Sequence, residues 1–327
     1  MYNLIDISSL HVDFHLEESI VPAINGIDLA VKREKILGIV GESGCGKSVL
    51  ALSIMGLIPS PGKITNGKIL LNYNNSEIDL TKIDSNSQLM RNIRGNKISM
   101  IFQEPMTSLN PVFNIGDQII ETIRLHQKVN YSVSKQRTLK ILNEVGFPDP
   151  ATRIFDYPHQ LSGGMLQRVM IAMALVCKPL LLIADEPTTA LDVTIQAQVL
   201  KLMNEIKLGF KTTIIFITHD LGVIAKMADE VAIMYVGKIV EHAPVNEIFS
   251  NPKHPYTIGL LQSMPTLNRQ RNKPLSTIKG NVPNPGEIKS GCNFYPRCPK
   301  VMSRCKKEEP LLLNSSKNQK VSCFLYN

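Results

Sequence analysis

The stretch KILGIVGESGCGKSVLALSIMGLI, residues 35–58, constrains the fold of this chain more than any other feature. It begins with an apolar run, continues as a glycine-bearing loop and ends in a segment with helical periodicity, the context that a GxxxxGK(S/T) pattern requires. Gly41, Gly44 and Gly46 allow the loop to curl with its amides pointing inward, and the helix expected to begin near Lys47 adds its positive dipole end. The sequence therefore predicts an α/β fold with a phosphate-binding loop.

Every residue of this loop is a candidate contact to a bound phosphate group. The set comprises Gly41, Glu42, Ser43, Gly44, Cys45, Gly46, Lys47 and Ser48. Lys47 supplies a cation for the β and γ phosphates of a nucleotide, and the Ser48 hydroxyl can ligate the Mg²⁺ that bridges them. Cys45 is small, so we interpret it as a packing residue rather than a reactive thiol. The loop thus predicts nucleotide binding together with Mg²⁺.

A second apolar run, LLLIADEPTTALD at residues 180–192, ends in two adjacent carboxylates. Its composition predicts a buried strand. Asp185 fits the acidic residue that holds Mg²⁺ through its water shell, and Glu186 is placed to polarise the water that attacks the γ-phosphate. Together with the phosphate loop, this pair predicts nucleotide hydrolysis.

A third motif narrows the class of nucleotide hydrolase. LSGGMLQRVMIAMAL, residues 161–175, places Ser162, Gly163 and Gly164 before an apolar-periodic segment, which predicts a capped helix start that can bind an anion. With the nucleotide motifs on either side, this stretch resembles the signature of the ATP-binding cassette (ABC) ATPases. The resemblance covers residues 1–250, with every motif in family order.

The resemblance implies roles for further residues. Gln103 in ISMIFQEPMTSLNP matches the Q-loop glutamine, which would join Ser48 and Asp185 around Mg²⁺. His219 in IIFITHD matches the switch histidine, and Asp192 in TALD matches the D-loop aspartate. The expected catalytic residues are Glu186, His219 and Gln103.

Structural alternatives stay open for some of these residues. Gln103 can be an ordinary loop amide, and His219 can be a hydrogen-bonded histidine at a strand end. In the ABC family an aromatic residue ahead of the phosphate loop often stacks on adenine, and the resemblance makes Phe14 in LHVDFHLEE our candidate for this role. The face of a ring offers a base about 1–3 kcal/mol of stacking. Core packing is the alternative for Phe14.

The resemblance also implies an architecture. It consists of a P-loop NTPase core of the ABC ATPase type with an antiparallel β subdomain and an inserted helical subdomain. Residues 1–250 would form the ATPase domain, about 104–165 the helical subdomain, and 251–327 a Pro-rich, cysteine-containing C-terminal extension. Two such ATPase domains stack head to tail in that family, so that LSGG of one closes on the ATP held by the other. Because this chain carries one cassette, a second ATPase subunit is expected, either a copy or a paralogue.

Three stretches indicate a subfamily. HPYTIGLL at residues 254–261, QEPMTSLNP and DEPTTALDVTIQAQVL together resemble the ATPases of the dipeptide, oligopeptide and nickel importers. The resemblance implies a subunit that couples ATP hydrolysis to peptide import, with nickel import as the alternative. The expected partners are two transmembrane permease subunits, the second ATPase subunit and, indirectly, an extracytoplasmic solute-binding protein. His242 and His254 are interpreted as isolated surface histidines rather than nickel ligands.

The sequence predicts a peripheral location on the cytoplasmic face of the membrane. No segment has about 18 or more uninterrupted apolar residues, and the N-terminus lacks the basic start and apolar stretch of a secretion signal.

The net charge of +8 is concentrated in residues 251–327, which contain 13 Lys and Arg against 3 Asp and Glu. This basic tail keeps open a second function, a non-transport ABC ATPase acting on nucleic acid or ribosomes. The single cassette and the lack of a long coiled-coil pattern count against it, so no nucleic-acid partner is expected.

Four of the six cysteines lie in the last 36 residues, at Cys292, Cys298, Cys305 and Cys323. In a reducing cytosol they are expected to form a metal site, an iron–sulfur cluster or free thiols. Gaps of five, six and 17 residues lack the tight CxxC pairs of structural zinc, whereas four thiolates on looser loops can surround a 4Fe–4S cluster. Some peptide-importer ATPases with a similar tail carry such a cluster, so we predict a 4Fe–4S site, with Zn²⁺ as the alternative. The basic residues expected to offset its negative charge are Arg297, Lys300, Arg304, Lys306 and Lys307.

Overall fold

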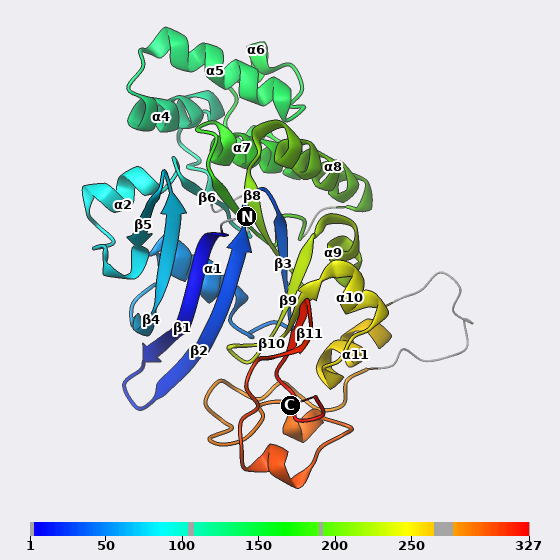
Figure 1. The fold of residues 1–327 in the computed structure, drawn as a ribbon. Helices are drawn as coiled ribbons and strands as arrows, with labels where there is room; N and C mark the ends of the chain where they lie inside the picture. Colours follow the sequence, from blue (N-terminus) through cyan, green and yellow to red (C-terminus); the bar gives the residue numbers. More distant parts are fainter. Residues whose placement is uncertain (1–2, 104–107, 190–191, 265–276, 327) are drawn as a thin grey trace. The chain divides into compact units, whose positions relative to one another are not determined.

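The computed structural model describes residues 3–103, 108–189, 192–264 and 277–326. The chain forms two compact units (Figure 1). The first unit comprises Met1–Lys82 and Phe216–Asn327, and the second comprises Ile83–Ile215. Residues 104–107 of the QEPMTSLNP stretch and residues 190–191 of the TALD motif lie outside the described part of the chain.

The first unit contains a four-stranded antiparallel sheet in the order β2-β1-β4-β5. Its strands are β1 (Asn3–His15), β2 (Ile20–Lys32), β4 (Gly62–Tyr73) and β5 (Ser76–Asp79). In β1 the buried positions change from Ile5 and Ile7 to Leu10 and Val12, from odd to even numbers. A register shift between Ile7 and Leu10 keeps both pairs on the buried face, because one extra residue reverses the side to which the following side chains point.

The first unit also contains five consecutive strands of a larger sheet, in the order β11-β12-β10-β9-β3. β3 runs parallel to β9, and the other neighbours are antiparallel. The five residues of β3 are all buried, which explains its uninterrupted apolar sequence. The bounds are β3 (Ile36–Val40), β9 (Glu230–Tyr235), β10 (Lys238–Pro244), β11 (Leu313–Ser316) and β12 (Gln319–Val321). The extension therefore supplies β11 and β12, which lie side by side at one edge of this sheet.

Short helices complete the first unit. The phosphate loop leads into α1. Helix α9 precedes β9, and helices α10 and α11 follow β10. The α-helices are α1 (Lys47–Met55), α9 (Leu221–Met227), α10 (Val245–Ser250) and α11 (Pro255–Gln262). The 3-10 helices are η1 (Leu80–Lys82), η3 (Tyr295–Arg297) and η4 (Ser303–Lys306). After α11 the extension, orange to red in Figure 1, contains short elements joined by loops, as its frequent prolines predict.

The second unit combines three strands with the longer helices. β6 (Ile98–Ile101) pairs parallel with β7 (Leu181–Asp185), and β7 neighbours β8 (Thr213–Thr218), which ends in the first unit. The α-helices are α2 (Gln88–Ile93), α4 (Ile115–Gln127), α5 (Tyr131–Glu144), α6 (Pro150–Arg153), α7 (Gly163–Leu175) and α8 (Val193–Phe210), with η2 (Pro158–Gln160) before α7. Three of them, α4 to α6, fall within the segment expected to be a helical subdomain.

Polar side chains define where the long helices of the second unit begin. Asn114, Asn130, Ser162 and Asp192 cap α4, α5, α7 and α8, each accepting a hydrogen bond from an amide in the first turn. The helix start predicted at Ser162 is thus confirmed. In the described part of the chain, no helix combines the length and the apolar character needed to cross a membrane.

Candidate functional site

The phosphate loop joins β3 to α1 in the first unit. At Gly41 a β-carbon would lie 2.3 Å from the backbone oxygen of Met234 in β9, so only glycine fits there. Gly46 has a φ of +99°, and a β-carbon there would lie 2.7 Å from the backbone oxygen of Ala23 in β2. The helix begins at Lys47, where the sequence predicts it. The loop is therefore held between two strands, and its shape depends on both.

The lysine of the loop is buried beneath it, with 6 % of its surface exposed. Lys47 Nζ donates hydrogen bonds to the carbonyl oxygens of Gly41, at 2.9 Å, and Glu42, at 3.1 Å. Ser43 on the loop and Ser48 in the first turn of α1 are exposed. Burial raises the pKa of the Cys45 thiol, an effect larger than the opposing attraction of Lys47, so this cysteine is a buried neutral group. The hydroxyl groups of Ser43 and Ser48 thus face outward, while the ammonium group of Lys47 is held against the loop carbonyls.

The two predicted carboxylates lie at the end of β7 in the second unit. Asp185 is buried, and Glu186 has a φ of +48°, a left-handed conformation that non-glycine residues seldom adopt. Glu186 Oε2 accepts hydrogen bonds from Thr189 Oγ1, at 2.8 Å, and Gln103 Nε2, at 3.3 Å. The structure therefore brings two of the three predicted catalytic residues together. Sequence reasoning missed Thr189, although its position three residues after Glu186 was a usable signal.

The signature motif forms the start of α7. The Ser162 hydroxyl accepts a hydrogen bond from the Met165 amide at 3.4 Å, and a β-carbon at Gly163 would contact nothing within 4 Å. Gly164 lies near α8, since a β-carbon there would be 3.1 Å from Ile195. The open face at the start of the helix leaves its amides accessible to an anion.

The remaining predicted residues, Asp192, His219 and Phe14, belong to three other places in the chain. Asp192 caps α8 by accepting hydrogen bonds from the amides of Thr194 and Ile195, a structural role that sequence reasoning did not assign. His219 is exposed at the end of β8. Phe14 is half-buried in β1, and a β-carbon at Gly62 would lie 2.8 Å from its ring. A stacking role for Phe14 and a D-loop role for Asp192 stay predictions.

The four cysteines of the extension line a single small pocket in the first unit. Apolar and aromatic side chains complete its wall, among them Phe294, Pro310 and Phe324. Burial, reinforced by the neighbouring thiols, raises the pKa of Cys292 to about 11. Among the residues described, no three or more Cys, His, Asp or Glu side chains are arranged to hold one metal ion. The residues therefore gather around a common space without forming a single-ion site.

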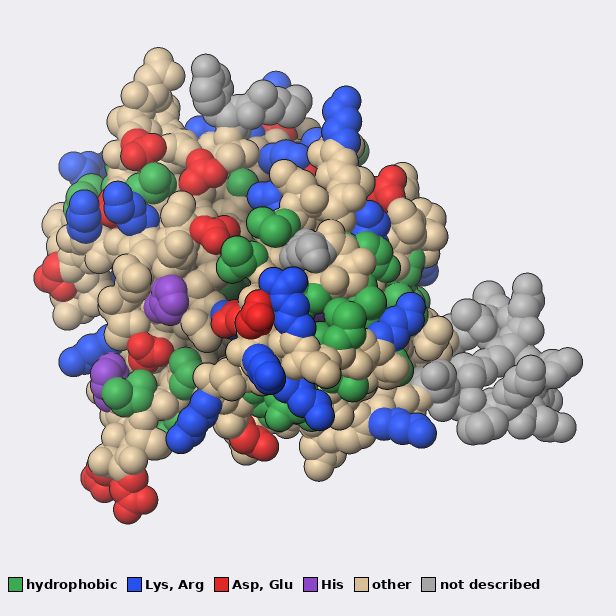
Figure 2. All heavy atoms as spheres, turned by 60° about the horizontal axis from the view of Figure 1, so that its bottom comes forward, with side chains coloured by type: hydrophobic (Ala, Val, Ile, Leu, Met, Phe, Trp, Pro, Cys, Tyr) green, Lys and Arg blue, Asp and Glu red, His purple; other side chains and the backbone are tan. Residues whose placement is uncertain are grey.

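The basic residues near this pocket include two that have acidic partners. Arg297 forms an ion pair with Glu42, and Arg304 pairs with Glu308 at 2.9 Å, so both guanidinium groups already have carboxylate partners. That these basic residues offset the charge of a cluster stays a prediction. Figure 2 brings the lower part of Figure 1, where the extension lies, toward the viewer. On this face the Lys and Arg side chains of the described residues lie scattered among acidic and apolar ones, with no continuous basic tract.

The interpretation of His254 as a surface residue is wrong. Its side chain is 1 % exposed, and its Nδ1 accepts a hydrogen bond from the Tyr256 amide at 3.1 Å, which caps α11. Burial lowers the pKa of His254 to about 3, so the imidazole stays neutral at physiological pH. His254 is therefore a structural histidine of the extension.

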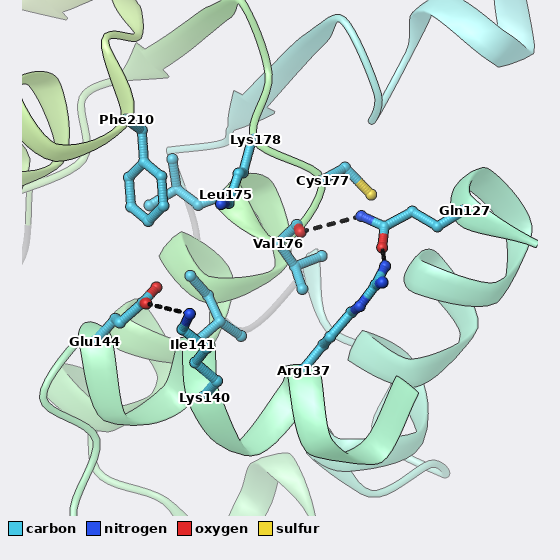
Figure 3. Close-up of a pocket in the computed structure, with 10 residues that line it drawn as sticks. All are labelled: Gln127, Arg137, Lys140, Ile141, Glu144, Leu175, Val176, Cys177, Lys178 and Phe210. Carbon is cyan, nitrogen blue, oxygen red and sulfur yellow. Dashed lines mark hydrogen bonds and ion pairs between the residues drawn. The ribbon is translucent and has the colours of Figure 1, made fainter. Parts of the chain in front are cut away.

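A separate pocket of about 400 Å³ lies in the second unit (Figure 3). Side chains from α4 and α5 and from the residues that follow α7 and end α8 line it. Gln127 donates a hydrogen bond to the Val176 oxygen and accepts one from Arg137, and Cys177 lies beside them with its thiol pKa raised by burial. None of the predicted nucleotide-binding residues lines this pocket, so it is not part of the candidate site.

Two family models match the chain. The model described as ABC transporter matches residues 24–189, and the model described as oligopeptide/dipeptide transporter, C-terminal region, matches residues 240–305. The chain is 49 % identical over 327 residues to the oligopeptide transport ATP-binding protein AppD of Bacillus subtilis, covering 100 % of this chain and 98 % of that protein. It is 47 % identical over 309 residues to the dipeptide transport ATP-binding protein DppD of Escherichia coli, covering 94 % of this chain and 92 % of that protein.

Solved structures show the same fold. A post-hydrolysis dimer of the ATP-binding cassette MJ0796 bound to ADP and Pi has a TM-score of 0.65 at 24 % identity, and the match covers 74 % of this chain and 98 % of that one. The chain belongs to the ABC transporter family and is an ATP-hydrolysing subunit. The predicted fold class and ATPase activity are thereby confirmed. Subunits of this family work with transmembrane permeases and a paired ATPase, and a nucleic-acid partner is not expected.

The buried His254 should make the stability of the chain depend on pH. The unfolded chain binds a proton on this residue near pH 6.5, whereas the folded chain resists protonation down to about pH 3, so stability falls as the pH is lowered through this window. At about 1.4 kcal/mol per pH unit, lowering the pH to 5 should cost about 2 kcal/mol. His254→Asn keeps a capping acceptor and should remove this contribution in urea titrations at pH 7 and pH 5. An unchanged pH dependence in the variant would contradict the prediction.

Proposed function

We propose that this chain powers an ABC importer for dipeptides or oligopeptides and acts on the cytoplasmic face of the membrane. The observation that carries the proposal is the extent of the likeness, which spans the whole chain and includes residues 240–305 in addition to the cassette. The relatives that share this arrangement are described as oligopeptide and dipeptide transport ATP-binding proteins. An ABC cassette alone would account for residues 24–189 but not for the C-terminal region.

In this proposal the phosphate loop binds ATP. Lys47 would contact the β and γ phosphates, and the exposed Ser48 hydroxyl, Gln103 and Asp185 would hold Mg²⁺, which would offset the charge of the phosphates. The remaining loop residues offer backbone amides at the start of α1, where the helix dipole favours an anion. The buried position of Lys47 against the loop carbonyls supports this role, because its ammonium group is already held within the loop.

Hydrolysis is assigned to the carboxylate of Glu186, which polarises the attacking water. Thr189 and Gln103 orient this carboxylate through the hydrogen bonds described above, and His219 would contact the γ-phosphate. Ser162, with its two following glycines, would bind the ATP held by the paired subunit. ATP then favours the closed pair because its γ-phosphate contacts both subunits, and hydrolysis removes those contacts.

Replacing the carboxylate of Glu186 tests this assignment. Glu186→Gln should lower kcat for ATP hydrolysis by about 10²–10⁴-fold, the usual contribution of a positioned general base, while ATP binding and ATP-driven pairing persist. Phosphate release and size-exclusion chromatography measure the two properties. Glu205→Gln is a matched control, since Glu205 lies on the surface of α8 and pairs only with Lys201 among the ion pairs described there. Full activity in Glu186→Gln would exclude it as the water-polarising residue.

The transport assignment is tested with the assembled complex. When the full chain is purified from its native membrane, two permease subunits and a second ATPase subunit should accompany it. In proteoliposomes, a solute-binding protein loaded with a tripeptide should stimulate ATP hydrolysis, whereas the same protein exposed to Ni²⁺ should not. Stimulation by Ni²⁺ alone would replace the peptide assignment with nickel import, and salt-sensitive binding of RNA without any permease would overturn transport itself.

We further propose that the four-cysteine pocket holds a 4Fe–4S cluster. The four cysteines line one small pocket, and a cluster spreads its four ligands farther apart than a single zinc ion does. Without a metal, the raised pKa of Cys292 keeps its thiol protonated, so binding would release a proton there. The cluster would join loops of the extension that contain little regular structure.

Anaerobic purification tests this assignment. The full chain should be brown and contain about four iron atoms, as a 4Fe–4S site requires, and Cys298→Ser should remove most of the iron. Cys177→Ser is the matched control, because Cys177 lies in the second unit and should leave the iron content unchanged. A colourless wild-type protein with one zinc ion per chain would establish the alternative, and a metal-free protein would exclude both.

A further inference from the structure

The extension holds one residue of the phosphate loop by two separate contacts. Arg297 Nη1 and Nη2 donate hydrogen bonds to the two carboxylate oxygens of Glu42, at 2.7 and 3.0 Å. The Tyr256 hydroxyl accepts a hydrogen bond from the Glu42 amide at 3.0 Å. The carbonyl oxygen of the same residue accepts one from Lys47. Glu42 is therefore linked to the extension through its side chain and its amide, and to the loop lysine through its carbonyl.

Arg297 is itself fixed in place. Its side chain is 4 % exposed, against 29 % for Glu42. Its Nε donates to the Lys279 oxygen at 3.3 Å, and Nη1 also donates to the Tyr235 hydroxyl at 3.4 Å. The hydrogen bonds to Glu42, and less so the contact with Tyr235, raise the pKa of Arg297 above its ordinary value. A two-pronged contact between a fixed guanidinium and a carboxylate defines direction as well as distance.

The segment that carries Arg297 is attached to the same part of the core. Phe294 packs against Tyr235 and Tyr256, with ring centroids 5.3 and 5.5 Å apart, and the side-chain Nδ2 of Asn293 donates to the Val236 oxygen at 3.3 Å. Asn293, Phe294 and Arg297 lie between Cys292 and Cys298 in the sequence. The loop contact is therefore part of the packed segment that also supplies two thiols of the cysteine pocket.

We propose that Arg297 is a positioning residue for nucleotide binding. A free carboxylate on the phosphate loop would repel a triphosphate bound to the same loop, because like charges raise each other's energy even at a partly exposed site. Arg297 offsets this charge and holds the Glu42 side chain against the extension, which leaves the loop amides and Lys47 to bind the anion. By reciprocity, nucleotide binding stabilises the segment from Cys292 to Cys298. The extension thus tunes the affinity of the ATP site.

This inference rests on the proposed binding of nucleotide to the phosphate loop, and the two can fail separately. If the wild-type chain does not bind ATP, the proposed nucleotide site is wrong. If the wild type binds ATP and loss of Arg297 has no effect, only the role of Arg297 is wrong.

A charge-removal pair of variants tests the role. Fluorescent ATP titration should show Arg297→Gln binding about tenfold more weakly than wild type, within the usual range for coupled sites. The double variant Glu42→Gln/Arg297→Gln should recover most of this loss, because no uncompensated carboxylate remains. Arg304→Gln is the matched control. Arg304 also precedes a pocket cysteine, but it pairs with Glu308 at the surface, so the affinity of this variant for ATP should equal that of wild type.

Two results would overturn the role: an Arg297→Gln affinity within about twofold of wild type, or a double variant that binds as weakly as the single one, since coupled sites change affinity about fivefold or more. If Arg297→Gln does not fold, amide hydrogen exchange of the wild type decides. ADP should slow exchange in residues 292–298 more than in residues 313–321, which form the outer strands of the sheet. ADP is the appropriate probe because it lacks the γ-phosphate that joins two subunits. Equal or absent slowing in the two segments would exclude the coupling.

Discussion

The close approach of the phosphate loop to the backbones of β2 and β9 is the constraint on which the site depends. Side chains at Gly41 and Gly46 would meet carbonyl oxygens at 2.3 and 2.7 Å, so the loop can pack there only through glycine. The Gly237 amide, just after β9, donates to the Cys45 oxygen at 2.9 Å and fixes the loop from the same side. Residues that position β9 therefore also position the phosphate loop. The C-terminal extension contributes such a residue, because Arg297 donates a hydrogen bond to the hydroxyl of Tyr235 at the end of β9.

The extension folds by completing the core rather than by building a core of its own. Glu241 in β10 is fully buried, and its carboxylate accepts hydrogen bonds from the amides of Lys253 and His254 and from Gln319 Nε2, at 2.8, 2.9 and 2.7 Å. A buried carboxylate is tolerated only with such partners. Two of these donors come from the start of the extension and one from β12 near its end. The core thus supplies a buried acidic side chain, and residues near both ends of the extension provide its hydrogen-bond donors.

The sequence allowed prediction of features that depend on neighbouring residues and missed those that depend on distant ones. The helix start at Lys47 and the cap at Ser162 follow from short motifs, and both are found in the structure. The pair of Arg297 with Glu42 joins positions 255 residues apart, which no local pattern reveals. His254 gave the wrong impression for the same reason, because its burial comes from tertiary packing. Thr189 lies between these cases, since its spacing from Glu186 is local but its hydroxyl has no motif of its own.

The basic composition of the extension shows how a net charge can mislead about partners. A surface that binds nucleic acid needs accessible cations gathered in a stripe or patch. Here Arg297 pairs with Glu42, and Lys253 donates to the Ser315 oxygen at 3.2 Å within the extension. Residues 1–250 carry 25 acidic against 23 basic side chains, so the positive net charge of the chain comes from the extension. At least these two cations are therefore engaged by groups of the chain itself, and the phosphate loop is the place where one of them forms its ion pair.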